Sequence, residues 1–211
     1  MTARTSLGVL VSGSGTNLQA ILDATRTSAL PADVRVVISN VAEARALDRA
    51  RAASVPAVAL PHRDYPDRRS FDRAVVAALR DHGVEWVVLA GFMRLVTSEL
   101  LGAFPGRVVN IHPALLPAFP GVNAQRQAVE YGVKLTGCTV HLVDEGTDTG
   151  PILAQRAIAV EDGDDEDSLR ARLLTVEHAL LVEVLAAIAE GRLERRPPGP
   201  LGRERLHLRP R

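Results

Sequence analysis

The sequence is poor in cysteine and has no excess of charge of either sign. Cys138 is the one cysteine among 211 residues, so no disulfide can form within the chain, and one argument for an exported protein is lost. Basic and acidic side chains number 25 each, which gives a formal net charge of zero. Nothing in the overall charge therefore draws the chain toward nucleic acid or an anionic membrane.

Long hydrophobic runs are also missing. The first apolar run, residues 7–11, is shorter than the apolar part of a signal peptide, and it continues into Ser-Gly-Ser-Gly without a cleavage pattern. No stretch approaches the roughly 20 apolar residues of a membrane span. We therefore expect a cytoplasmic protein without a membrane partner. Its composition, 46% hydrophobic and 24% charged, is typical of a globular chain with an ample core.

Short apolar runs alternate with longer, helix-like stretches through the first half of the chain. This order predicts an α/β fold in which a doubly wound, mostly parallel sheet carries helices on both faces. The predicted strands are residues 7–12, 34–39, 57–60, 86–90 and 107–111, and the predicted helices are residues 16–27, 42–53, 69–82 and 98–103.

The second half of the chain changes character. Residues 136–143 and 152–160 are predicted strands, and residues 168–190 are one long helix that stops at a glycine, so a mixed sheet is expected here. Six carboxylates in residues 161–167 are interpreted as a solvated loop whose acids favour the positive N-terminus of that helix. We expect a single domain over residues 1–191.

Residues 192–211 form a basic, proline-rich tail. It holds seven arginines and two glutamates, and its prolines at 197, 198, 200 and 210 are expected to block regular structure, so the tail should dock loosely or fray. A basic tail could bind RNA, but aromatic residues that would stack on bases are not interleaved with the arginines. No nucleic-acid partner is expected.

A glycine-rich turn follows the first predicted strand and opens a helix, in the order Ser-Gly-Ser-Gly-Thr-Asn-Leu at residues 12–18. A dinucleotide fingerprint is disfavoured because position 18 is leucine and the second strand ends without an acidic residue. A Gly-Lys-Ser/Thr sequence of the ATP-binding loop is missing too. What remains is an anion site for one phosphate at Gly15, Thr16 and Asn17, or a tight turn that needs glycine for backbone reasons alone.

The strand that ends in Val-Val-Asn-Ile-His-Pro carries a polar pair. The strand period of two places Asn110 and His112 on one face, about 6.7 Å apart along the backbone. Pro113 ends the ladder, so the pair lies at the carboxyl edge where open α/β sheets bind ligands. An amide and an imidazole suit a carbonyl undergoing addition, because both can hydrogen-bond its oxyanion and histidine can move protons. The plain alternative is a strand end whose polar residues face solvent.

Other chemistries find little support. Gly-x-Ser-x-Gly is missing, and Cys138 alternates with apolar residues as a core residue would. The six histidines show neither His-x-x-x-His nor His-x-His spacing, so no metal site is predicted.

Two carboxylates stand in unusual surroundings. Asp148 lies in an irregular loop, residues 144–151, where it could be held over a pocket to orient a histidine, or simply cap a turn. Glu177 falls in the middle of the apolar stripe of the long helix. A buried carboxylate requires a partner, so Glu177 binds either a ligand or a structural arginine.

Taken together, these stretches resemble the folate-dependent phosphoribosylglycinamide formyltransferases. The resemblance runs from about residue 7 to residue 192. It is carried by Val-Ser-Gly-Ser-Gly-Thr-Asn-Leu-Gln-Ala at 11–20, Leu-Ala-Gly-Phe-Met-Arg at 89–94, Asn-Ile-His-Pro-Ala-Leu-Leu-Pro at 110–117 and the segment 144–151.

The resemblance implies formyl transfer from 10-formyltetrahydrofolate to the amine of glycinamide ribonucleotide, in purine biosynthesis. It implies that Asn110 and His112 stabilise the oxyanion and that Asp148 positions His112 and assists proton transfer through water. Small-molecule substrates and a monomer or homodimer are implied, without a metal. The implied phosphate ligands are Gly15, Thr16 and Asn17, the ribose ligand is Glu177, and the folate site comprises Arg68, Met93, Arg94, Leu95, Val96 and Asn110.

Two positions depart from the family pattern, and other functions stay open. Asn123 stands where many relatives carry histidine, and Ala114 replaces a frequent serine. A 10-formyltetrahydrofolate hydrolase would share the Asn-x-His and Asp pattern but is expected to carry an additional N-terminal domain. Transfer to methionyl-tRNA would require a further C-terminal domain, and a non-catalytic nucleotide-binding module would not need the trio Asn110, His112 and Asp148.

Overall fold

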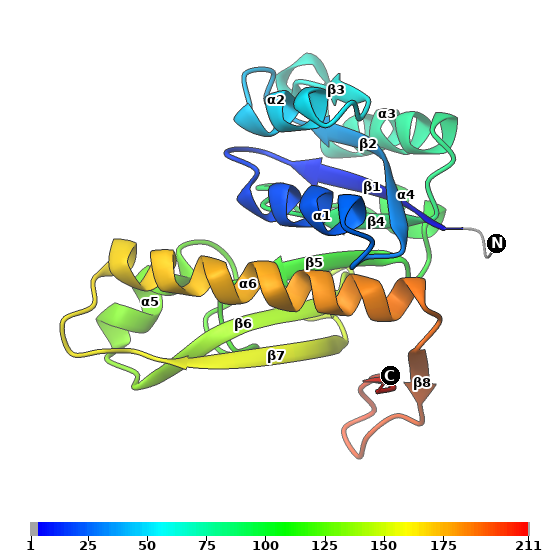
Figure 1. Cartoon of the computed structure of the whole chain (residues 1–211). Helices are drawn as coiled ribbons and strands as arrows, with labels where there is room; N and C mark the ends of the chain where they lie inside the picture. The colour runs from blue at the N-terminus through cyan, green and yellow to red at the C-terminus, as the bar shows by residue number, and fades with distance from the viewer. Residues whose placement is uncertain (1–3, 211) are drawn as a thin grey trace. The chain divides into compact units, whose positions relative to one another are not determined.

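A computed structural model describes residues 4–210 of the chain (Figure 1). Seven strands follow one another in the hydrogen-bonded order β3-β2-β1-β4-β5-β6-β7, and two more strands form a separate pair. The first five are parallel neighbours and β6 and β7 are antiparallel, so the predicted doubly wound α/β fold with a mixed C-terminal part is confirmed. The chain divides into two compact units, the first ending at Asn110 and the second beginning at Ile111, and each is described by itself.

The first unit alternates strands and helices in chain order. Its central strand β1 is buried on both faces, as expected for a strand with parallel neighbours on either side. Helices α1 and α2 pack against each other, as do α3 and α4. The elements are β1 (Thr5–Val11), α1 (Thr16–Arg26), β2 (Ala32–Ser39), α2 (Arg45–Ala52), β3 (Ala57–Ala59), the short η1 (His62–Asp64), α3 (Arg68–Asp81), β4 (Trp86–Leu89) and α4 (Ser98–Ala103). Strand β5 (Val108–His112) begins in the first unit and ends in the second.

The strand order of the first unit reverses at β1. The chain moves from β1 outward to β3 and then returns to β4 on the other side of β1. The turns that follow β1 and β4 therefore lie side by side at the carboxyl edge, the usual ligand position in such sheets. A hydrogen bond from the N–H of Ser12 to the carbonyl of Gly91, 3.0 Å long, joins the two turns directly.

The second unit is built on an antiparallel pair of strands covered by a long helix. Its elements after β5 are α5 (Ala124–Tyr131), β6 (Leu135–Leu142), β7 (Ile152–Ala159), α6 (Glu166–Ala189), β8 (Leu193–Arg196) and β9 (Arg205–Leu208). Helix α6 lies along β6 and β7 (Figure 1). The Asp165 carboxylate accepts a hydrogen bond from the Ser168 N–H at 2.8 Å, which caps α6 and confirms the interpretation of the acidic segment.

The prediction that the tail lacks regular structure is wrong. Strands β8 and β9 pair antiparallel, and together with the turn at 197–204 they form what we call the C-terminal hairpin. Strand β9 alternates polar and apolar residues, and Pro197, Pro198 and Pro200 all fall in the turn, where proline costs no ladder hydrogen bond. Residues 1–3 of the predicted domain and Arg211 of the tail lie outside the described residues.

Within residues 4–210, no helix is both long and apolar enough to cross a membrane, and that includes the 24 residues of α6.

Candidate active site

The turn after β1 is closely packed against α2. Gly15, at the start of α1, has a φ of 72°, in the left-handed region. A Cβ there would lie 2.6 Å from the Cβ of Ala46, so both backbone shape and space require glycine. Arg49 donates a hydrogen bond to the Ser14 carbonyl at 2.8 Å. The turn with Gly15, Thr16 and Asn17 is therefore a fixed feature at the positive end of an 11-residue helix.

The segment after β4 is anchored at both of its ends. At its start, the N–H of Met93 donates to the hydroxyl of Ser12 at 2.8 Å. At its end, the N–H and hydroxyl of Thr97 donate to one oxygen of Asp72, at 2.6 and 2.8 Å. Between these anchors, Met93 is 71% exposed and Leu95 is 53% exposed. The segment thus presents apolar side chains to solvent from a restrained backbone, as a site for a flat apolar ligand would require.

Asp72 lies near two arginines, Arg94 of this segment and Arg68 of α3. Sequence reasoning did not single out Asp72. Asp72 is buried on α3, and burial raises the pKa of its carboxyl despite the two hydrogen bonds from Thr97 and the charges of Arg94 and Arg68. Arg94 also lies over the ring of Phe71, 5.0 Å from its centre. The signal for Asp72 was its helical position next to buried apolar residues, where a carboxylate requires partners.

The polar pair lies at the end of β5, as predicted. Asn110 is the partner of Leu89 in the register of β4 and β5, so it stands beside the start of the segment just described. His112 follows two residues later as the last residue of the strand and is 4% exposed. The alternative that this polar pair is a strand end facing solvent is therefore wrong for His112.

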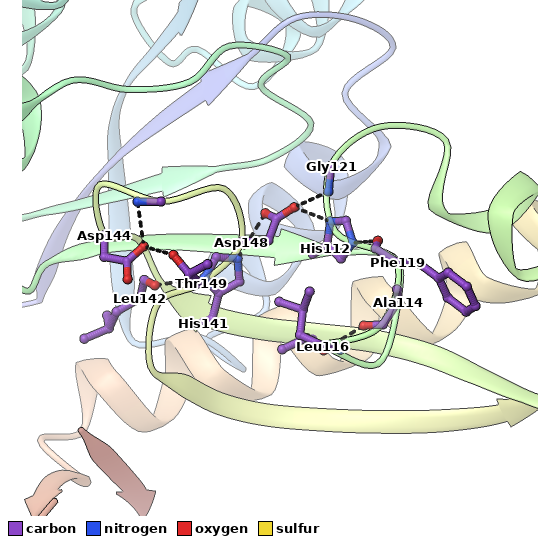
Figure 2. A network of polar contacts seen from close by, with 12 residues as sticks. His112, Ala114, Leu116, Phe119, Gly121, His141, Leu142, Asp144, Asp148 and Thr149 are labelled. Atoms are coloured by element: carbon purple, nitrogen blue, oxygen red, sulfur yellow. Dashed lines mark hydrogen bonds and ion pairs between the residues drawn. The ribbon is translucent and has the colours of Figure 1, made fainter. Parts of the chain in front are cut away.

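His112 is held between two hydrogen-bond acceptors (Figure 2). Its Nε2 lies 2.8 Å from the carbonyl oxygen of Phe119, and its Nδ1 lies 3.2 Å from Oδ2 of Asp148. Both of these neighbours only accept, so the neutral ring donates its one proton either to the Phe119 carbonyl or to the Asp148 carboxylate, and the protonated ring donates to both.

Burial and charge act in opposite directions on this pair. Burial lowers the pKa of His112 below its ordinary value, although the charge of Asp148 and the Phe119 carbonyl oppose that change, and His141 adds to it. Burial also disfavours the ionised form of Asp148. Hydrogen bonds from His141 and the Gly121 N–H, together with the charges of His112 and His141, outweigh burial and hold the pKa of Asp148 below its usual value. At neutral pH the pair is therefore a neutral imidazole and a carboxylate.

A second histidine, which sequence reasoning did not place in the site, faces the same carboxylate. His141 is buried on β6, with Nε2 3.6 Å from Oδ1 of Asp148 and Nδ1 2.8 Å from the carbonyl of Leu142 (Figure 2). Gly121 donates its N–H to Oδ2 of Asp148 at 2.7 Å. The sequence signal for His141 is that a histidine occurs between apolar residues of a predicted strand.

The segment between His112 and α5 is fixed by Thr139 of β6. The Thr139 hydroxyl donates to the Ala114 carbonyl at 2.7 Å and accepts from the Leu116 N–H at 3.0 Å. Ala114, which departs from the family pattern, is fully buried here. Asn123, the other departure, begins α5 with a φ of 58°, a conformation that asparagine tolerates better than most residues.

Glu177 and Cys138 lie where the sequence predicted them. Glu177 is 5% exposed among the buried leucines of α6. Burial, with a further contribution from the charge of Glu177, raises the pKa of the Cys138 thiol to about 12. Cys138 is therefore an inert core residue, and Glu177 is close enough to influence it.

The structure brings some of the predicted residues together. In the first unit, the turn with Gly15 and the segment with Met93 are hydrogen-bonded neighbours. In the second unit, His112 and Asp148 are in contact. No group of three His, Cys, Asp or Glu side chains among residues 4–210 is arranged to hold a metal ion.

Comparison with known proteins identifies the family. Residues 6–185 match the formyl transferase family model. A phosphoribosylglycinamide formyltransferase of Mycobacterium tuberculosis is 49% identical over 183 residues, which cover 87% of this chain and 84% of that protein. The trifunctional purine biosynthetic protein adenosine-3 of Drosophila pseudoobscura is 44% identical over 91% of this chain, which spans 14% of that longer protein.

Solved structures agree with this comparison. Glycinamide ribonucleotide transformylase 1 of Symbiobacterium toebii has a TM-score of 0.93 and 50% identity, covering 99% of this chain and 95% of that one. The phosphoribosylglycinamide formyltransferase of Bacillus halodurans has a TM-score of 0.85 and 42% identity, covering 87% of this chain and 95% of that one. The chain therefore belongs to the formyl transferase family and, within it, to the phosphoribosylglycinamide formyltransferases.

Proposed function

We propose that this chain transfers the formyl group of 10-formyltetrahydrofolate to the amine of glycinamide ribonucleotide. The observation that carries the proposal is the buried contact between His112 and Asp148. His112 lies two residues after Asn110 on the same strand. In the reaction, a bond forms between the amine nitrogen and the formyl carbon, and the bond from that carbon to N10 of the folate breaks. The amine loses a proton and N10 gains one.

We assign the charge that develops on the formyl oxygen to Asn110 and His112. The amide N–H of Asn110 and Nε2–H of His112 would donate to this oxygen as the tetrahedral intermediate forms. In the free protein, Nε2 lies 2.8 Å from the Phe119 carbonyl oxygen. The formyl oxygen would take the place of that carbonyl as the acceptor, so binding of the donor requires the segment around Phe119 to give way.

We assign proton handling to the contact between His112 and Asp148. The Asp148 carboxylate opposes the effect of burial on the imidazole, because its charge favours the protonated ring. It would therefore stabilise an imidazolium that forms during the reaction when the ring takes up a proton, and the Nε2–H of that cation would donate to the oxyanion. Asp148 would also accept, through water, the proton that the attacking amine releases.

The binding roles are proposed within each unit. In the first, Gly15, Thr16 and Asn17 would hold the substrate phosphate at the N-terminus of α1. The folate would lie on the segment of Met93, Arg94, Leu95 and Val96, with Arg68 nearby on α3. In the second unit, Glu177 would bind ribose hydroxyls.

The proposed function is tested by measuring folate product release, followed by absorbance, from purified protein and a 10-formyl folate. We expect release that strictly requires glycinamide ribonucleotide. Release at the same rate without the amine would show that water is the acceptor and that the hydrolase interpretation is right. No release in either case from folded protein would favour a binding module.

The phosphate assignment predicts a selective effect of Gly15→Ala. The added methyl would clash with Ala46, and the left-handed backbone at this position disfavours alanine. The turn must therefore shift, and its N–H groups would no longer point at the substrate phosphate. We expect the KM for glycinamide ribonucleotide to rise about tenfold or more, since one hydrogen bond to a charged group contributes about 1.5–3 kcal/mol. The KM for the folate should change much less.

Gly83→Ala is the matched control for this prediction. Gly83 also has a positive φ, 64°, but no atom lies within 4 Å of an added Cβ. The control therefore carries the same kind of backbone strain without the clash at the turn. Equal KM values in the Gly15 variant and the wild type would contradict the phosphate assignment.

A further inference from the structure

The backbone at Asp148 is strained. Its φ is 54°, in the left-handed region that residues other than glycine rarely adopt. Such a conformation is unfavourable for a residue with a side chain and persists only where the surrounding structure holds it. The contacts that hold residues 144–150, which we call the Asp148 loop, therefore also keep its carboxylate against His112.

Some of these contacts come from within or beside the loop. Oδ1 of Asp144 accepts hydrogen bonds from the Gly146 N–H at 3.1 Å and from the Thr149 hydroxyl at 2.7 Å. At the end of the loop, a Cβ on Gly150 would lie 1.8 Å from the carbonyl oxygen of Leu142, so the backbone packs directly on β6. These contacts restrain residues 144, 146, 149 and 150 of the loop.

Another contact comes from the C-terminal hairpin. Nη2 of Arg203 donates to the carbonyl of Thr149, the residue after Asp148, at 2.5 Å. The C-terminal hairpin and the Asp148 loop also line the same cavity of about 380 Å³, and its lining includes Thr147, Asp148, Arg203 and Leu206. A guanidinium hydrogen bond to a carbonyl is charge-assisted and stronger than a neutral one.

The hairpin is itself tied to the end of α6. Arg192 donates to the carbonyl of Arg209 and pairs with Glu190, while Arg209 donates to the carbonyl of Gly191 at 3.0 Å. These bonds join the start of β8 to the residues after β9 and to the helix. Arg203 therefore reaches the Asp148 loop from an anchored element.

We propose that Arg203 is a positioning residue: through the Thr149 carbonyl it holds the Asp148 loop so that the carboxylate stays on His112. The inference rests on the catalytic role proposed for Asp148. The C-terminal hairpin lies beyond residues 6–185, the part of the chain that the family model matches. A tail that the sequence presents as an irregular appendage thus contributes to the active site.

The test compares Arg203→Ala with Arg203→Lys and Arg196→Ala. Lysine retains a donor that can reach a carbonyl, so it should restore part of the loss. Arg196 is an exposed arginine of the same hairpin that pairs with Glu194, and its removal controls for charge and hairpin stability. We expect Arg203→Ala to lower kcat about 5- to 10-fold with both KM values within about twofold, and Arg196→Ala to match the wild type.

Two further readouts separate positioning from a purely structural role. Combining Arg203→Ala with Asp148→Asn should produce no loss beyond that of Asp148→Asn alone, because both changes act on the same carboxylate. The titratable groups that face His112 are Asp148 and His141, and only Asp148 favours the protonated ring. If Arg203→Ala lets the Asp148 carboxylate move away, the pKa of His112, followed by NMR titration, should therefore fall.

The outcomes distinguish this inference from the proposed function. An unchanged kcat and an unchanged His112 titration in Arg203→Ala would overturn the inference, as would an equal loss of kcat in Arg196→Ala. If the wild type shows no formyl transfer, the proposed function fails, yet the NMR titration still reports whether Arg203 holds Asp148 in place.

Discussion

His112→Ala is expected to lower kcat by about 10²-fold or more, the loss typical of removing one oxyanion donor. The change deletes both the Nε2–H that would reach the formyl oxygen and the Nδ1 that contacts Asp148 at 3.2 Å. Steady-state kinetics with both substrates measures the effect. Asn110→Ala is expected to give a loss of similar size, because it removes the other proposed donor.

The control for this prediction is His82→Ala. His82 lies at the C-terminus of α3, where its ring contacts the Ala78 carbonyl, and it has no assigned role. Circular dichroism and thermal unfolding establish that each variant is folded. Turnover near that of the wild type in both His112→Ala and Asn110→Ala would refute the assigned mechanism.

Asp148→Asn is expected to lower kcat by about 10²-fold or more while nearly preserving shape. The asparagine oxygen can still accept the hydrogen bond from Gly121, but the negative charge beside His112 is lost. That charge is the main influence that favours the protonated imidazole against burial. Without it, an imidazolium that forms during the reaction is left buried and uncompensated.

The same variant predicts a change in pH dependence with a definite sign. In the wild type, burial already places the pKa of His112 below 6.5, so the acid limb of its activity lies below that pH. In Asp148→Asn the pKa of His112 should fall further, and the acid limb of the residual activity should move to lower pH. Asp162→Asn, which removes an exposed carboxylate paired with Lys134, should leave both kcat and the limb unchanged. An acid limb that moves to higher pH would contradict the assignment.

Much of the fold could be predicted because the signals were local. Within residues 4–210, alternating apolar runs and capped helical stretches located the seven strands of the sheet and five of the six α-helices to within a few residues. Helix α5 was missed, since it is only eight residues long and no side chain caps its N-terminus. The C-terminal hairpin was missed because the prolines were taken to disrupt the whole tail, whereas the structure confines Pro197, Pro198 and Pro200 to its turn.

The site could be predicted only in part. Strand alternation paired Asn110 with His112, and the helical wheel placed Glu177 in the core, because both patterns depend on spacing along one element. The contact of His112 with Asp148 came from family resemblance, since 36 positions of chain separate them and no periodicity links them. The other partners of Asp148 are a histidine on β6 and a backbone N–H, and only a folded chain brings these together.

The buried cysteine gives the protein a practical property. The thiol of Cys138, fully buried and with a pKa of about 12, is neither accessible nor ionised near neutral pH. Thiol reagents act on the thiolate, so the native chain behaves toward them as if it contained no cysteine. A single cysteine introduced at an exposed position such as Thr147 would carry a fluorophore or spin label at that position alone. The movements of the Asp148 loop can thus be followed without first removing a native residue.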